Sequence, residues 1–236
     1  MLELRNIYWS TPSGHEVLHD ISLSIDGSGI VVITGPNGGG KTTIAKIIAG
    51  IEKPDSGSIL FNGEDITDLG VTERARKGIS YAFQQPVRFK GLTVRDLLDM
   101  ASGRKLDEKE ICSLLSKVGL CAKDYVERDV DASLSGGEIK RIEIATVFAR
   151  KTRFSVFDEP EAGIDLWSFP RLIGAFEDLR KESGGIEVII SHQERILDIA
   201  DRVIVIENGR VKEDGKRNIL DSLLRSASCP ACPKRS

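Results

Sequence analysis

A glycine-rich run at residues 35–42, G-P-N-G-G-G-K-T, fits the phosphate-binding pattern G-x-x-x-x-G-K-[ST]. It follows a β-branched run at residues 30–34 and precedes helically spaced apolar residues, which is the strand–loop–helix setting that the chemistry needs. Glycines let backbone N–H groups wrap phosphates, and the helix N-terminus adds a favourable dipole. The run predicts binding of ATP, with Lys41 at the β and γ phosphates and Thr42 ligating Mg²⁺. The predicted phosphate-binding residues are Gly35, Pro36, Asn37, Gly38, Gly39, Gly40, Lys41, Thr42 and Thr43.

Two adjacent acids, Asp158 and Glu159, end the apolar run at residues 154–157. If that run is a strand of a parallel sheet, both carboxylates lie at its carboxyl edge, where the phosphate-binding loop also opens. We expect Asp158 to orient Mg²⁺ and Glu159 to polarise the attacking water. Together with Lys41 they predict an ATPase that releases ADP and phosphate.

A second phosphate cradle is predicted at residues 134–138, L-S-G-G-E. Ser135, Gly136 and Gly137 offer a hydroxyl and backbone N–H groups at the start of a helix. One nucleotide does not need two cradles from the same chain. We therefore expect a head-to-tail homodimer in which each chain completes the site of the other and two ATP molecules lie between them.

These motifs follow one another in the order found in ATP-binding cassette (ABC) ATPases, which the chain resembles from about residue 2 to residue 220. The resemblance implies a P-loop NTPase of ABC type. It also implies that Gln84 contacts Mg²⁺ and the lytic water, that His192 bonds the γ-phosphate, and that Asp165 crosses the dimer interface. Gln85 competes with Gln84 for the first role, although Phe83–Gln84 fits the family spacing better.

The adenine base is the one part of the nucleotide without an obvious partner. Most cassettes stack adenine on an aromatic ring at the position that Pro12 occupies here. Either Tyr8 or Trp9, just upstream, swings across, or the base lacks a ring at a cost of about 1–3 kcal/mol of binding.

Strand-like and helix-like segments alternate along the chain, and this alternation predicts an α/β fold with a mainly parallel sheet. We also expect an N-terminal antiparallel β region and an inserted helical lobe. We expect the catalytic core at residues 1–84 and 134–225, the lobe at 85–133 and a flexible tail at 226–236. Asp107 and Glu110 predict a capping box, and Asn208–Gly209 predicts a hairpin turn. Strands are expected at residues 17–25, 30–34, 58–61, 79–83, 154–157, 187–190 and 203–206. Helices are expected from after Gly40 to about Gly50, within 93–119, and at 137–150, 169–181 and 195–200.

Composition narrows the setting of this chemistry. The 236 residues are 40% apolar with a formal charge of -3, which does not suggest nucleic acid as a partner. No apolar run approaches the roughly 20 residues needed to span a bilayer, and the N-terminus has no signal-like pattern, so we expect a cytoplasmic protein. Four cysteines do not form a disulfide scaffold in a chain of this size; Cys229 and Cys232 either sit in an exposed tail or complete a metal site with a partner.

The partner is expected to dock beside Gln84, near Val87 and Phe89. Local strings resemble the SufC branch of the family, which powers iron–sulfur cluster assembly, and imply a soluble scaffold of SufB or SufD type. The alternative is the nucleotide-binding subunit of a membrane transporter, docked on transmembrane permease subunits. The compact lobe is shorter than that of bacterial SufC. The strings that carry the resemblance are at residues 82–87, 128–130, 135–144 and 191–198.

Overall fold

The computed structural model describes residues 1–219, so the predicted tail and its two cysteines lie outside the described residues. An antiparallel sheet contains the strands in the order β2-β1-β4-β5. Its strands are β1 (Leu2–Ser10), β2 (Glu16–Ile25), β4 (Ser56–Phe61) and β5 (Glu64–Asp65).

A second, six-stranded sheet has the order β10-β9-β3-β8-β7-β6. All its neighbouring strands run parallel except β10, which pairs antiparallel with β9 through the predicted turn at Asn208–Gly209. The mainly parallel sheet and the antiparallel N-terminal region are therefore confirmed. The strands are β3 (Gly29–Thr34), β6 (Ile79–Ala82), β7 (Phe154–Asp158), β8 (Ile186–Ile190), β9 (Arg202–Glu207) and β10 (Arg210–Gly215).

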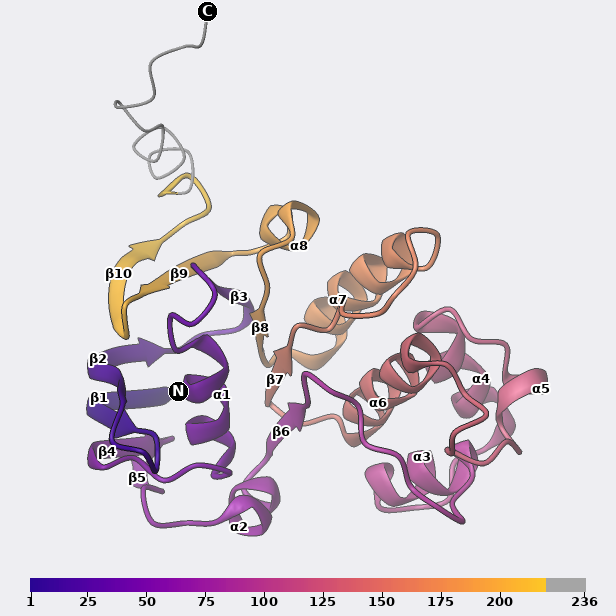
Figure 1. Ribbon diagram of the computed structural model, residues 1–236. Coiled ribbons are helices and arrows are strands. Elements are labelled where there is room, and N and C mark those ends of the chain that lie inside the picture. The colour runs from indigo at the N-terminus through magenta and orange to yellow at the C-terminus, as the bar shows by residue number, and fades with distance from the viewer. Residues whose placement is uncertain (220–236) are drawn as a thin grey trace, which may run out of the picture.

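The two sheets enclose α1 (Lys41–Ala49), as Figure 1 shows. Its Ile44, Ile47 and Ile48 join one apolar cluster with residues of both sheets, including Leu4 and Ile33. Every residue of β3 is buried. One face of the strand meets this cluster, and the other face meets a second apolar cluster, which includes residues of α3, α4, α6 and α7. The start of α1, which carries the predicted phosphate-binding loop, is thus fixed from two sides.

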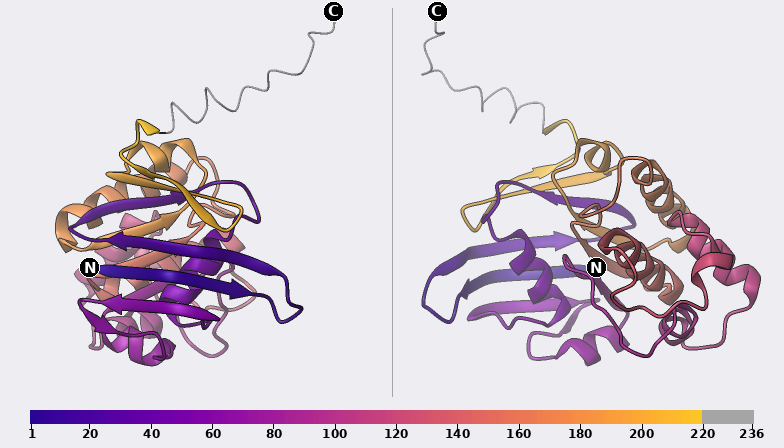
Figure 2. Two further views of the ribbon diagram at one scale, coloured as in Figure 1. Left: turned by 90° about the vertical axis from the view of Figure 1, so that its left-hand side faces the viewer. Right: turned by 45° about the vertical axis from the view of Figure 1, so that its right-hand side comes forward.

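Helices α3 to α8 lie on the other side of the six-stranded sheet or beyond it (Figures 1 and 2). The lobe contains α3 (Val94–Ser102), α4 (Glu108–Lys117) and α5 (Ala122–Tyr125), and α6 (Gly136–Arg150) packs against α3 and α4. The longer connections to the last strands contain α7 (Phe169–Ser183) and α8 (Glu194–Asp198). None of the helices that the structure describes combines the length and the apolar character required to cross a membrane.

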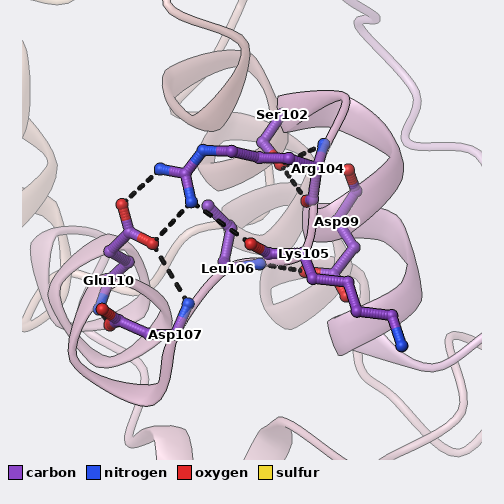
Figure 3. A network of polar contacts seen from close by, with 7 residues as sticks. All are labelled: Asp99, Ser102, Arg104, Lys105, Leu106, Asp107 and Glu110. Carbon is purple, nitrogen blue, oxygen red and sulfur yellow. Dashed lines mark hydrogen bonds and ion pairs between the residues drawn. The ribbon is translucent and has the colours of Figure 1, made fainter.

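The segment at residues 93–119, for which the sequence predicts helical structure, contains two helices, α3 and α4. They meet at a polar network (Figure 3). The predicted capping box is present, since Glu110 N donates to Asp107 Oδ1 at 2.8 Å. Arg104 bonds the Glu110 carboxylate through both terminal nitrogens, and Leu106 N donates to Asp99 Oδ1 at 2.8 Å. The bonds to Arg104 and to the Asp107 backbone lower the pKa of Glu110 to about 2. These contacts fix the angle between α3 and α4.

Sequence patterns did not indicate α2 (Val71–Arg76), and a buried arginine explains its place. Arg74 is 1% exposed and donates to Ile48 O and Thr67 O at 3.0 Å and to Leu69 O at 2.8 Å. Its guanidinium also bonds Ile47 O, which accepts from Gly50 N as well, so Arg74 adds donors to the carbonyls at the end of α1. Burial lowers the pKa of Arg74.

Candidate nucleotide-binding and hydrolysis site

The glycine-rich loop connects β3 to α1 and rests against the β9–β10 hairpin. Gly35 has φ of 135°, and a Cβ there would lie 2.0 Å from the carbonyl oxygen of Ile206, so no other residue fits. Gly209 N donates to Gly39 O at 3.1 Å and ties the loop to the hairpin turn. The backbone N–H groups before α1 are therefore held in place by neighbouring backbone, as a phosphate cradle requires.

Lys41, the first residue of α1, lies inside this loop. It is 6% exposed, and Nζ donates to Gly35 O and to Pro36 O at 2.8 Å each. Burial lowers the pKa of Lys41, while the charges of Glu159 and Asp158 raise it. The ammonium group is thus held between the loop and the two acids that end β7.

Thr42 and Asp158 form a pair of oxygen ligands suited to magnesium. Thr42 Oγ1 donates to Asp158 Oδ1 at 3.1 Å, and Tyr81 Oη donates to Asp158 Oδ2 at 3.0 Å. Asp158 is fully buried, and burial raises its pKa against these two bonds, which lower it. Mg²⁺ bound with a nucleotide takes one or two protein oxygens and phosphate oxygens, so the donor set fits the ion. Sequence reasoning missed Tyr81, which comes from β6.

Glu159 and Gln84 meet beside this pair. Gln84 Nε2 donates to Glu159 Oε2 at 2.8 Å, which places the amide that follows β6 against the acid that follows β7. The backbone of Glu159 has φ of 45°, a left-handed conformation that is uncommon for a glutamate, and its N–H donates to Ile190 O at 3.0 Å. Strained backbone of this kind gathers at functional sites.

A buried ion pair below this contact was not expected from the sequence. Lys140 is 0% exposed; its Nζ bonds Phe83 O, donates to Asp158 O at 3.2 Å, and lies 3.5 Å from Glu143 Oε2. Phe83 N donates to Glu143 Oε1 at 2.8 Å. Burial lowers the pKa of Lys140 and raises that of Glu143. The only signal in the sequence was a Lys and a Glu three residues apart on an otherwise apolar helix face.

His192 follows β8, the strand between β7 and β3. Its side chain is exposed, whereas the preceding Ser191 is 0% exposed. Ser191 Oγ donates to Glu161 Oε1 at 2.5 Å and accepts from Gln193 N at 3.0 Å. Glu161 is a further residue that sequence reasoning did not single out.

The second predicted cradle begins α6. Ser135 is its N-cap and forms a capping box with Glu138, whose carboxylate also accepts from Tyr125 Oη. A Cβ on Gly137 would lie 2.4 Å from the carbonyl oxygen of Gly163, so this cradle packs directly on the loop before Asp165. Within residues 1–219 no hydrogen bond or ion pair is found between Ser135–Gly137 and the loop at residues 35–40.

The aromatic residues proposed for adenine both lie in β1. Trp9 pairs with Leu18 of β2 and packs against the cluster around α1, and Leu18 lies against Gly40 at the start of that helix. Tyr8 is 41% exposed, and its carbonyl accepts from Asp55 N. Trp9 therefore lies on the strand pair that borders the phosphate-binding loop. Stacking of adenine on Trp9, stacking on Tyr8 and the lack of any ring all stay open predictions.

Comparisons with known proteins show which family has this sequence and fold. Residues 18–162 match the family model described as ABC transporter. An ABC transporter ATP-binding protein of Methanocaldococcus jannaschii is 37% identical over 93% of this chain and 90% of its own length. The lipopolysaccharide export system ATP-binding protein LptB of Haemophilus influenzae is 31% identical over 85% of this chain and 84% of its own length. A dimeric ATP-binding cassette in a post-hydrolysis state, bound to ADP and Pi, has a similar fold, with a TM-score of 0.81 at 22% identity over 92% of this chain and 99% of that one.

Proposed function

The chain belongs to the ABC transporter ATP-binding family and is an ATPase, and on that premise we propose that it is the nucleotide-binding subunit of a membrane transporter. The observation that carries the proposal is an exposed apolar groove directly beside Gln84. The relatives support it, since they are ATP-binding proteins of transporters, and one of them is named for lipopolysaccharide export.

We propose that hydrolysis takes place where β3, β6, β7 and β8 end. Lys41 and the loop before it bind the β and γ phosphates, and Thr42 and Asp158 hold Mg²⁺, which when bound neutralises charge on the phosphate oxygens. Glu159 accepts a proton from the attacking water, which Gln84 and His192 hold in line. The Gln84–Glu159 bond keeps the base and the water-orienting amide within reach of one another.

Two phosphate cradles in one chain support hydrolysis in a head-to-tail homodimer. The loop at residues 35–40 begins α1, and Ser135–Gly137 begin α6, which packs with the lobe. Each nucleotide would lie between the first cradle of one chain and the second cradle of its partner, with Asp165 at the interface. The dimer then couples nucleotide binding to the relative position of the two chains.

The groove beside Gln84 is about 180 Å³ in volume. Phe83, Val87 and Phe89 on its wall are 39%, 43% and 41% exposed, and they lie together around one groove, as apolar side chains at interaction sites do. A short amphipathic helix from a transmembrane subunit fits such a groove, because its apolar face would cover these side chains. The full lining is Tyr81, Phe83, Val87, Phe89, Leu97, Ala101, Val130, Ile139, Ile142, Glu143 and Thr146.

A second candidate is SufC-like work in iron–sulfur cluster assembly, with a SufB- or SufD-like soluble scaffold in the same groove. It rests on the strings at residues 135–144 and 191–198 alone, and the names of the relatives do not support it. In either case Lys140 and Glu143 join the groove to Asp158. Both candidates require the same ATPase chemistry. They differ in whether the partner of the groove lies in a membrane.

Affinity purification from native membranes and from the soluble fraction separates the candidates. The proposal expects a permease that co-purifies and raises ATP turnover in bilayers. The variants V87D and F89D should lower the ratio of stimulated to basal rate, because each places a charge in the apolar groove. M100D is the matched control, since Met100 is 68% exposed on α3 and does not line the groove. Stimulation by a soluble scaffold without lipid would instead establish the second candidate.

A further inference from the structure

A carboxylate between the ends of β7 and β8 has no role in the mechanism above. Glu161 lies in the turn after Glu159, and its Oε1 accepts from Ser191 Oγ at 2.5 Å. Ser191 is the residue immediately before His192 in the turn after β8. The contact therefore joins the turn that carries the proposed base to the turn that carries the proposed γ-phosphate ligand.

Ser191 is anchored on every side. Its side chain is 0% exposed and, besides donating to Glu161, accepts from Gln193 N at 3.0 Å. Its own N–H donates to Ile33 O of β3 at 3.2 Å. These bonds lie on both sides of His192, whose side chain is exposed and interacts with Glu161 through its charge, without a side-chain hydrogen bond to any of the described residues. The position of the ring thus depends on how rigidly this turn is held.

Burial of a carboxylate costs folding free energy, and a single hydrogen bond from a hydroxyl group does not offset that cost. Glu161 Oε2 is buried and has no hydrogen-bond partner among the described residues. Burial and the charge of Glu159 raise the pKa of Glu161, while the bond from Ser191, a bond from its own backbone and the charge of His192 lower it. Buried, incompletely satisfied carboxylates destabilise a fold, so their presence beside a reactive centre points to a functional role.

We propose that Glu161 is a positioning residue for hydrolysis, which holds His192 through Ser191 at a fixed place relative to Glu159. The neighbouring backbone makes this effective, because Glu159 N also donates to Ile190 O and so joins the same two turns. The inference rests on the proposed role of His192. Loss of the anchor leaves the phosphate cradle intact and lets the histidine turn move, so it should lower kcat more than it changes KM.

The test uses the full chain with MgATP and compares E161L, E161Q, S191A, H192A and the double variant E161L/H192A. We expect E161L to lower kcat about 10-fold, because small misplacements of a catalytic group cost this much or more, while KM stays within about 2-fold. E161Q should retain most activity, since the amide oxygen still accepts from Ser191. In the H192A background, E161L should cost less than about 2-fold, because the residue it positions is gone. E177L, at an exposed glutamate of α7, is the control.

Several results would overturn the inference. They are a normal kcat for both E161L and S191A, equal losses in E161L and E161Q, or an effect of E161L that multiplies fully with that of H192A. A parallel fall of kcat, ATP affinity and melting temperature in E161L and E161Q would show a structural role instead. If H192A itself turns over normally, the proposed role of His192 is wrong and the inference falls with it. If H192A is impaired and E161L is not, only the inference falls.

Discussion

Neighbouring carboxylates have different surroundings at the end of β7. Asp158 is fully buried, and both of its oxygens accept bonds, from Thr42 and from Tyr81. Glu159 is half-buried and accepts from Gln84, and its left-handed backbone turns it away from the strand. A fixed, buried carboxylate suits a metal ligand, whereas a more accessible one suits exchange of a proton with water.

At this scale the first prediction concerns E159Q. The amide keeps the shape and a hydrogen bond to Gln84 but cannot accept the proton, so hydrolysis should fall by about 10²- to 10⁴-fold. Nucleotide binding should persist, and ATP-bound dimers should accumulate. Steady-state phosphate release, equilibrium ATP binding and size-exclusion chromatography with ATP measure the three effects. Near-normal turnover in E159Q would remove Glu159 as the base.

The buried pair of Lys140 and Glu143 yields a prediction of stability. K140M leaves the Glu143 carboxylate buried without its cation, and breaking such a pair costs about 3–5 kcal/mol of unfolding free energy. K140M/E143L should be more stable than K140M by at least about 1 kcal/mol, because no unpaired charge remains. Urea unfolding measures both values. Equal stability of K140M and K140M/E143L would mean that the unpaired Glu143 charge is not what destabilises K140M.

The sequence best predicted those elements of the fold that depend on residues close together in the chain. The capping box of Asp107 and Glu110 and the hairpin turn at Asn208–Gly209 depend on residues only a few positions apart, and both were found. The split between α3 and α4 was not specified in advance, because it depends on Gly103 in a left-handed conformation and on Arg104 reaching Glu110.

Residues of the site were predictable where a motif carries them and unpredictable where only the fold does. Asp158 and Glu159 follow from one short string. Tyr81 and Glu161 gain their roles from strands far apart in the sequence, β6 beside β7 and β8 beside β7. The sequence of one strand does not predict which residues of the adjacent strand in the sheet will lie beside it.

The start of α6 gives a prediction about acid. Bonds from Tyr125 and then from Ser135 lower the pKa of Glu138 from 4.5 to about 2. Because the folded pKa is depressed, the stabilisation is present above about pH 4.5 and is lost as the pH falls through about 2. Since solvent screens this partly exposed group, we expect E138Q to be less stable by about 1 kcal/mol at neutral pH.

Urea unfolding at pH 7 and at pH 3 tests this prediction. The difference in unfolding free energy between the wild type and E138Q should shrink at the lower pH, whereas E177Q should match the wild type at both. A difference that does not change with pH would mean that the carboxylate charge of Glu138 contributes nothing to the helix start.

At the scale of the whole molecule, two surfaces beside the site are exposed in a single chain: the apolar groove next to Gln84 and the loop that carries Asp165. Asp165 Oδ1 accepts from Trp167 N and Ser168 N, a turn that leaves Leu166 and Trp167 73% and 88% exposed. The second cradle packs on the same loop through Gly137 and Gly163. An apolar pair next to the proposed second phosphate cradle is the kind of surface that a second copy of the chain would cover. Because Trp9 also fluoresces and is a candidate for stacking on adenine, the fluorescence of Trp167 in a W9F background is the readout of that contact.

The last prediction tests whether the two cradles act in different chains. K41A disables the first cradle and S135R the second, so either variant alone should be inactive. In a mixed head-to-tail dimer, one site contains both defects and the other contains neither. With random pairing in an equal mixture, half of the dimers are mixed and each has one of two sites intact. The mixture should therefore regain roughly one quarter of the wild-type rate if the sites act independently.

A mixture of K41A with D158N is the matched control for this complementation. Lys41 and Asp158 serve the same side of the site, which one chain supplies, so every site in that mixture keeps one defect and no activity should return. Pairing in both mixtures is checked by crosslinking in the presence of ATP. If K41A and S135R pair and stay inactive, either the cradles act within one chain or both sites must work together. Recovery in both mixtures would mean that Lys41 and Asp158 do not serve the same site from one chain, and the assignment of the two halves of the site would be wrong.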